Sequence, residues 1–130
     1  MERRLSALLD TSVVIATDER GELSLPTVAA ISVITLGELR AGVLRAADDW
    51  VRAARAQRLA AVRAAFAALP VDEDVAERYG EALAAARDLG RTTKATDLLI
   101  IATAAAGGRT LYTLDAAQAG LARDLRVAVA

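Results

Sequence analysis

The chain has 130 residues, of which 55% are hydrophobic and 25% are charged, and its formal net charge at pH 7 is −1. A chain of this length most simply forms one domain, residues 1–130, and buries about two thirds of its unfolded surface. The absence of cysteine excludes disulfides, zinc sites with cysteine ligands and thiol nucleophiles. Because the charges balance, any site for a polyanion has to be local.

The first residues do not have the pattern of a secretory signal. An apolar run over 5–9 follows Arg3 and Arg4, but Asp10 interrupts it before it reaches the length of a signal's apolar region. No stretch of the sequence approaches the length of a transmembrane helix. We therefore expect a cytoplasmic protein with no membrane partner.

The first predicted elements are two buried strands, each followed by a helix. Residues 5–9 predict a strand that leads through Asp10 into a turn and a helix. Residues 29–32 predict a second strand, and Ser32 suits the N-cap of a helix that runs toward Arg45. Strand and helix thus alternate from the start of the chain.

Two longer helices are predicted in the middle of the chain. Asp48 or Asp49 can cap a helix that continues through about Ala67. The segment Leu69-Pro-Val is a short extended link, after which Asp72 and the next two acids favour the start of a helix that reaches about residue 89.

The last part of the sequence predicts one helix between two strands. Thr93 or Thr96 can cap the helix, which ends at Gly107-Gly108. Residues 110–114 predict a strand that closes on an aspartate, and residues 125–129 predict a final strand. Strands that alternate with helices predict the α/β class, with a mostly parallel central sheet between two helical layers.

Four acidic residues stand beside or inside apolar stretches: Asp10, Glu38, Asp97 and Asp115. A carboxylate removed from water is costly unless it is paired or binds a metal. Asp10 and Asp115 follow predicted strands and would emerge at the carboxyl ends of parallel neighbours, where open α/β sheets bind ligands. Three of the acids can be explained as helix caps, first-turn anions or turn residues, but Glu38 lies within a helix between apolar neighbours. One shared site explains all four.

Two glycines flank Glu38 inside its predicted helix. Glycine in a helix interior costs up to about 1 kcal/mol relative to alanine. We expect Gly37 and Gly42 to pack closely against the site, which would explain that cost.

The acids also belong to motifs that resemble the signature blocks of PIN-domain ribonucleases. The resemblance is closest to the VapC toxins of bacterial toxin–antitoxin pairs, covers essentially the whole chain, and matches in order and spacing. The blocks are Leu-Leu-Asp10-Thr-Ser, Ser32-Val-Ile-Thr35-Leu-Gly-Glu38-Leu, Thr96-Asp97-Leu-Leu-Ile-Ile-Ala102-Thr-Ala and Thr113-Leu-Asp115. The resemblance implies a three-layer α/β/α PIN-like domain, an RNA substrate, a homodimer and a cognate antitoxin protein.

The resemblance further implies that the four acids bind Mg²⁺ or Mn²⁺ and hydrolyse RNA phosphodiesters. The residue inventory agrees, because a chain without histidine or cysteine offers mainly oxygen ligands, which these ions prefer. Metal-bound hydroxide is then the natural nucleophile. We expect Asp10 and Asp97 to be the most direct ligands, while Glu38 and Asp115 complete the site directly or through waters. An Asp10→Asn variant should lose cleavage and be at least as stable without metal, because repulsion among the acids is relieved.

Three hydroxyl side chains are candidate supporting residues. Thr113 matches the usual hydroxyl of the family. Thr11 and Ser12 lie in the turn after the first strand, where they can orient a carboxylate or a water. Simple turn formation and helix capping explain Thr11 and Ser12 equally well.

Five basic residues are candidates for binding RNA phosphates. Arg52, Arg55 and Arg63 fall within a narrow arc of one predicted helix, although an ordinary solvated helix face has the same pattern. Arg91 and Lys94 stand just before Asp97 and can meet a phosphate near the metal, or serve only as solubilising loop residues.

Two alternative functions remain. A housekeeping PIN nuclease that processes RNA would share the same acids, but a compact chain without an appended domain favours the toxin. A catalytically silent PIN-like module would bind RNA or a protein, but the presence of all four acids argues against it. Asp115 is the least secure of the four, because the segment after it lacks the aromatic residue that the family commonly has there.

Overall fold

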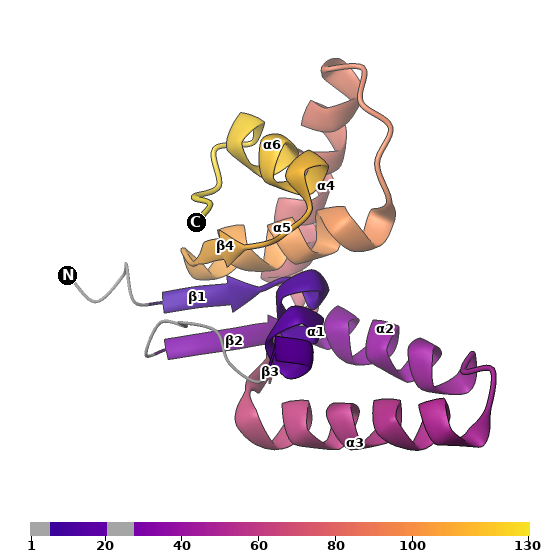
Figure 1. Ribbon diagram of the computed structural model, residues 1–130. Helices are drawn as coiled ribbons and strands as arrows, with labels where there is room; N and C mark the ends of the chain where they lie inside the picture. The colour runs from indigo at the N-terminus through magenta and orange to yellow at the C-terminus, as the bar shows by residue number, and fades with distance from the viewer. Residues whose placement is uncertain (1–5, 21–27) are drawn as a thin grey trace.

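The computed structural model describes residues 6–20 and 28–130. The predicted α/β class is confirmed: among these residues four strands form one sheet, and six helices flank it (Figure 1). In chain order the elements are β1 (Ser6–Leu9), α1 (Thr11–Arg20), β2 (Val28–Ser32), α2 (Val33–Leu44), α3 (Asp49–Ala65), β3 (Ala67–Leu69), α4 (Glu73–Asp88), α5 (Ala95–Gly107), β4 (Thr110–Tyr112) and α6 (Ala116–Asp124). Leu5, the first residue of the first predicted strand, lies outside the described residues.

The strands are parallel and lie in the order β3-β2-β1-β4. Successive side chains of a strand point to opposite faces, and β1 is apolar on both. Leu8 packs with buried residues of α4, α5 and α6, whereas Ala7 and Leu9 pack with those of α1, α2 and α3. A sheet that is apolar on both faces needs helices on both faces, so the predicted three layers are confirmed.

Side-chain caps begin three of the helices as the sequence predicts. Ser32 accepts a hydrogen bond from Ile34 N at 3.0 Å at the start of α2. Asp48 caps α3, and Asp72 caps α4. A capping side chain satisfies backbone N–H groups that have no partner inside the helix, so its effect is local and readable from sequence.

The predicted caps of α5 are wrong at one end and right at the other. Neither Thr93 nor Thr96 caps the helix; Lys94 holds the N-cap position and makes no side-chain hydrogen bond there. At the other end Gly108 has a φ of 62°, the left-handed conformation that ends helices and that glycine adopts without strain.

The region around β3 differs from the prediction. The helix expected through about Ala67 ends at Ala65, and the following residues form β3, which pairs with β2 through Ala30↔Ala67 and Ser32↔Leu69. A three-residue edge strand has too short a pattern to be recognised without its partner.

The predicted final strand over 125–129 is also wrong. The segment 113–115 leads into α6, and the residues after that helix contribute only one isolated parallel bridge, between Val129 and Leu111. The prediction did not include helix α6. Its sequence signal is Asp115, which follows a strand and caps the helix.

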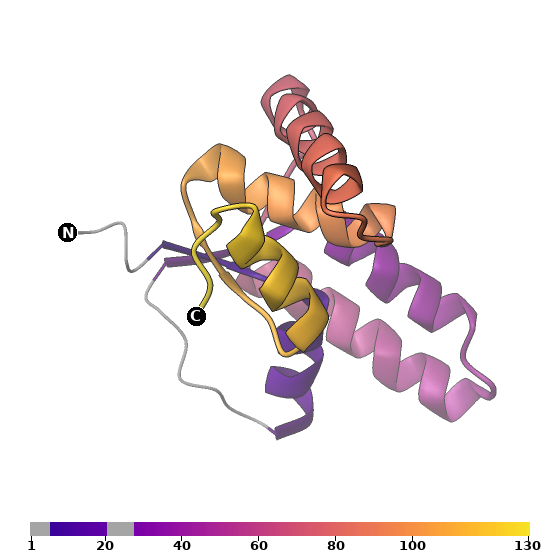
Figure 2. The ribbon, with the colours of Figure 1, turned by 90° about the horizontal axis from the view of Figure 1, so that it is seen from above.

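Helices α2 and α3 run side by side in opposite directions and extend past the carboxyl ends of the strands (Figures 1 and 2). Helix α1 begins at that same end of the sheet. Across residues 6–20 and 28–130, no helix combines the length and hydropathy that a membrane crossing requires.

Candidate active site

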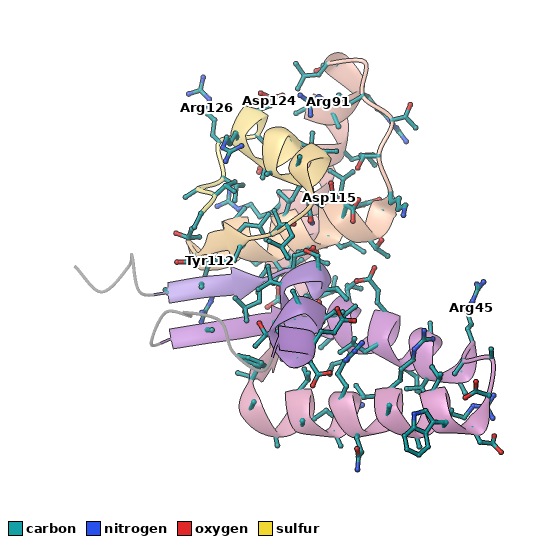
Figure 3. All side chains as sticks on the ribbon, in the orientation of Figure 1. Arg45, Arg91, Tyr112, Asp115, Asp124 and Arg126 are labelled. Carbon is teal, nitrogen blue, oxygen red and sulfur yellow. The ribbon has the colours of Figure 1, made fainter. Side chains whose placement is uncertain are left out.

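The candidate site lies at the carboxyl ends of β1 and β4. The two strands are parallel neighbours, as predicted, and the helices that follow them, α1 and α6, pack against opposite faces of the sheet. Such a change of face leaves a crevice at the carboxyl ends. Asp10 follows β1 directly, and its backbone N–H donates to Tyr112 O of β4 at 2.9 Å. Asp115 stands three residues after β4, at the start of α6 (Figure 3).

Asp10 is buried, with 6% of its surface exposed, and its carboxylate is held by hydroxyl and amide donors. Its Oδ2 accepts hydrogen bonds from Ser12 Oγ at 2.7 Å, Ser12 N at 3.2 Å and Thr113 Oγ1 at 3.1 Å. The bond from Ser12 N also caps α1, so the structural role and the proposed role of Asp10 coexist. Ser12 and Thr113 therefore orient the carboxylate of Asp10.

Gln118 is a further member of this cluster that the sequence reading missed. It is buried on α6, with 3% of its surface exposed. With its amide nitrogen turned inward, it donates to Thr113 Oγ1 at 2.9 Å and lies 3.2 Å from each carboxylate oxygen of Asp10. Its position three residues after Asp115 has the spacing of a capping box, in which the side chain would turn back to the cap's own N–H. The buried side of α6 directs it to Asp10 instead.

Glu38 has its own hydroxyl partner. Thr11 Oγ1 donates to Glu38 Oε1 at 2.6 Å, and it lies 3.0 Å from Thr35 Oγ1. Thr35 is fully buried, which fixes the position of this pair. Thr11 thus donates to the carboxylate of Glu38 rather than to that of Asp10, its neighbour in sequence. Thr35, part of the same motif as Glu38, was not recognised as a contributor.

Asp97 is half-buried in the first turn of α5, and the other three acids affect its pKa. Burial raises the pKa of the Asp97 carboxyl most, and the charges of Asp10 and Asp115 raise it further. The charge of Lys94 lowers this pKa, and Glu38 contributes a smaller increase. Four acids that lie far apart in sequence therefore share one electrostatic environment.

The donor chemistry of this environment suits a hard cation. Carboxylate and hydroxyl oxygens are the ligands that Mg²⁺ and Mn²⁺ prefer. Within the described ranges, no three Asp, Glu, His or Cys side chains are already arranged to hold an ion. Asp115 is exposed, and its Oδ1 accepts hydrogen bonds from Ala117 N at 2.9 Å and Gln118 N at 3.1 Å at the start of α6. The charges of the acids thus interact, but their side chains do not form a preformed coordination shell.

A cavity of about 320 Å³ adjoins Glu38, and only one of the three predicted basic residues of α3 lines it. Arg55 lines this cavity, whereas neither Arg52 nor Arg63 does. Arg52 instead turns toward the end of α2, where it donates to Ala46 O at 3.4 Å. Arg58, which was not predicted, also lines the cavity.

The two basic residues before Asp97 have different positions. Arg91 donates to the carboxylate of Asp124, toward which it points (Figure 3), so it joins the loop before α5 to the end of α6. Lys94 is exposed, and its charge lowers the pKa of Asp97. Of the two, Lys94 remains next to the candidate site.

The family model described as PIN domain matches residues 7–124, a span that contains all four acids. The chain belongs to the PIN-domain family. This PIN domain is 45% identical over 100 residues to Ribonuclease VapC8 of Mycobacterium tuberculosis, which covers 75% of this chain and 88% of that relative. It is 39% identical over 113 residues to Ribonuclease VapC5 of the same organism, covering 85% of this chain and 83% of the relative.

A solved structure agrees with the sequence relatives. The chain superposes with a TM-score of 0.81 and 38% identity on a crystal structure titled as a member of the VapBC family of toxin–antitoxin systems, VapBC-5 from Mycobacterium tuberculosis. The alignment covers 97% of this chain and 96% of that one. The resemblance stated from the sequence motifs is therefore confirmed at the level of family and fold.

Proposed function

We propose that this PIN domain is a metal-dependent endoribonuclease that acts as the toxin of a toxin–antitoxin pair. The observation that carries the proposal is the gathering of Asp10, Glu38, Asp97 and Asp115 in one environment: burial raises the pKa of Asp97 most, and the charges of the other three acids raise it further. Like charges concentrated at the carboxyl ends of a parallel sheet are unfavourable unless a cation joins them. Similarity to proteins named ribonucleases supports RNA as the substrate.

Asp10 and Asp97 are proposed as the most direct metal ligands, with Glu38 and Asp115 completing the site directly or through waters. A bound Mg²⁺ or Mn²⁺ ion would neutralise charge on the phosphoryl group and lower the pKa of a bound water. The remaining contribution of the chain is positional. Ser12, Thr113 and Gln118 hold the carboxylate of Asp10, while Thr11 holds that of Glu38. Donors that hold a carboxylate in this way orient it toward an ion and a phosphate.

RNA needs cations near the acids because each nucleotide brings a negative charge. Lys94, at the N-cap of α5, and Arg55, on α3, are the proposed phosphate contacts next to the site. Arg52 and Arg63 stay candidates for contacts with phosphates farther along the RNA. The pairing of Arg91 with Asp124 supports a structural role for this arginine instead.

The proposed partners are a cognate antitoxin protein and a second copy of the chain, in the cytoplasm. A neighbour in structure is titled a member of a toxin–antitoxin family, which supports the antitoxin. Co-purification with the product of the adjacent gene tests that partner, and size-exclusion chromatography with light scattering tests the homodimer.

The central experiment maps cleavage ends on total cellular RNA with and without Mn²⁺, using Asp10→Asn as the control. The proposal expects discrete ends, in tRNA, rRNA or mRNA, that need both Mn²⁺ and Asp10. Ends confined to the maturation sites of precursor RNAs would favour the housekeeping nuclease. Binding of RNA without any new ends would favour the silent module.

A further inference from the structure

The cavity beside Glu38 is a feature of this chain that the acids alone do not explain. It lies between α1, α2 and α3 and has a volume of about 320 Å³. Its lining consists of Thr11, Ile15, Glu19, Glu38, Leu39, Gly42, Arg55 and Arg58. A larger cavity of about 610 Å³ is lined by α4, α5 and the C-terminal segment, but none of the four acids lines it. The smaller cavity is therefore the one that continues the candidate active site.

Gly42 keeps part of this cavity open. We expected close packing to explain Gly37 and Gly42, and that expectation is wrong: a Cβ atom at either position would meet nothing within 4 Å. Glycine is one of the least favourable residues in a helix interior, so neither packing nor helix propensity accounts for it. Gly42 lines the cavity, whereas Gly37 is exposed elsewhere on α2. Any larger side chain at position 42 would occupy space in the cavity.

Arg55 provides the cavity with a positive charge. Its Nη1 donates to Gly42 O at 2.8 Å, which holds the half-buried guanidinium beside the cavity. Among the described residues no carboxylate pairs with it, whereas Arg58 pairs with Asp18 at 2.8 Å and Glu19 at 3.7 Å. A guanidinium has five N–H donors in a fixed plane that suits phosphate oxygens. Arg55 thus has donors left for an anion.

The rest of the lining is apolar or already paired. Ile15 and Leu39 offer aliphatic surface, and Glu19 lies 3.7 Å from Arg58, which also pairs with Asp18. A ligand that matches the cavity therefore combines an anionic group with a compact, largely uncharged body. It must also extend to Glu38, where the proposed chemistry takes place.

We propose that this cavity is a nucleotide subsite. It takes the ribonucleotide next to the phosphodiester bond that is cleaved, with the phosphate of that nucleotide on Arg55 and its ribose or base against Ile15 and Leu39. This inference rests on the proposed ribonuclease function. Among the residues that the structure describes, no aromatic side chain lines the cavity, so the subsite contributes affinity through phosphate contact and shape rather than base stacking.

The decisive test fills the cavity without touching the acids. Gly42→Leu is compared with Gly37→Leu, which makes the same change on the exposed part of the same helix. Leucine favours helices more than glycine does, so both variants should fold at least as well as the wild type. We expect Gly42→Leu to raise KM for a short RNA substrate at least tenfold, with unchanged Mn²⁺ affinity. Gly37→Leu should stay within twofold of the wild type.

Charge is tested with a second pair of variants. Arg55→Gln should raise KM and lower the slope of log(kcat/KM) against log salt concentration by about one, the value for one lost phosphate contact. Arg45→Gln is the matched control, because Arg45 is exposed at the end of α2 and points away from the body of the molecule (Figure 3). Its salt slope should equal that of the wild type. Equal slopes for all three proteins would contradict the assignment of Arg55.

The outcomes separate the subsite from the nuclease itself. A wild-type protein that cleaves no RNA with Mn²⁺ would overturn both. Cleavage by Gly42→Leu with the wild-type KM, or a parallel loss of its Mn²⁺ affinity, would overturn the subsite alone. If Gly42→Leu kept its RNA kinetics but escaped inhibition by the co-expressed product of the adjacent gene, the cavity would belong to a protein partner and the RNA assignment would be wrong.

Discussion

Replacing Asp10 by asparagine tests whether hydrogen bonds or repulsion dominate at the base of the site. Asp10 is 6% exposed, and its Oδ2 accepts three hydrogen bonds, two from Ser12 and one from Thr113. A neutral amide oxygen accepts each of these bonds less strongly by about 1 kcal/mol. Less repulsion offsets part of the loss, which leaves a destabilisation of roughly 2–3 kcal/mol.

For a chain of 130 residues the entropy of unfolding is about 0.27 kcal/mol/K, so this loss lowers Tm by roughly 7–11 °C. The sequence alone led us to expect a variant at least as stable as the wild type, and the hydrogen bonds to Asp10 reverse that expectation. Asp97→Asn should behave in the opposite way, because burial and the neighbouring acids raise the pKa of Asp97 and make its ionised form unfavourable.

Thermal unfolding followed by circular dichroism, in EDTA and then in Mn²⁺, measures both effects. We expect Asp10→Asn to unfold below the wild type in EDTA and Asp97→Asn to unfold above it. Mn²⁺ should stabilise the wild type more than either variant, and both variants should lose RNA cleavage. Ser12→Ala is the control, because it removes a donor to Asp10 but keeps the charge and should keep most of the stabilisation by Mn²⁺. An Asp10→Asn protein that equals or exceeds the wild type in EDTA would refute the reasoning.

Three further predictions concern single groups of the site. The folded-state pKa of Asp97 lies above its ordinary value of 3.8, so the folded protein binds more protons than the unfolded chain between these values. Metal-free stability should therefore fall as pH rises through that window, and urea titrations of Asp97→Asn should lack this component. Thr11→Val removes the donor to Glu38; we expect a loss of about 1 kcal/mol in stability and a cleavage rate reduced about tenfold, measured under single-turnover conditions. Unchanged cleavage would mean that the Glu38 carboxylate needs no positioning. Gln118→Leu removes the buried amide beside Asp10 and should weaken Mn²⁺ binding about tenfold in a calorimetric titration, whereas wild-type affinity would show that the amide only fills space.

Several features of the site could be predicted because they depend on local chemistry. Ser32 and Asp72 begin helices by accepting hydrogen bonds from N–H groups two or three residues away. Asp10 and Asp115 follow strands, and parallel strands place their carboxyl ends at one edge of a sheet. Neighbouring residues determine these features, so a sequence reading can recognise them.

Other features depend on partners that are distant in sequence. Strand β3 exists because Ala67 and Leu69 pair with β2, and Gln118 serves Asp10 because the packing of α6 turns its buried side toward β1. Arg91 lies close to Asp97 in sequence, yet it pairs with Asp124 of α6.

The sequence by itself determined the α/β class and most helix boundaries, and it marked four acids as candidate site residues, because hydrophobic periodicity, capping and charge placement act over a few residues. Only the tertiary structure decided which hydroxyl holds which carboxylate, that Arg55 and Gly42 share a cavity with Glu38, and that both helix glycines face open space. These outcomes depend on how whole helices pack against the sheet. The distances that packing sets between side chains cannot be read from spacing along the chain.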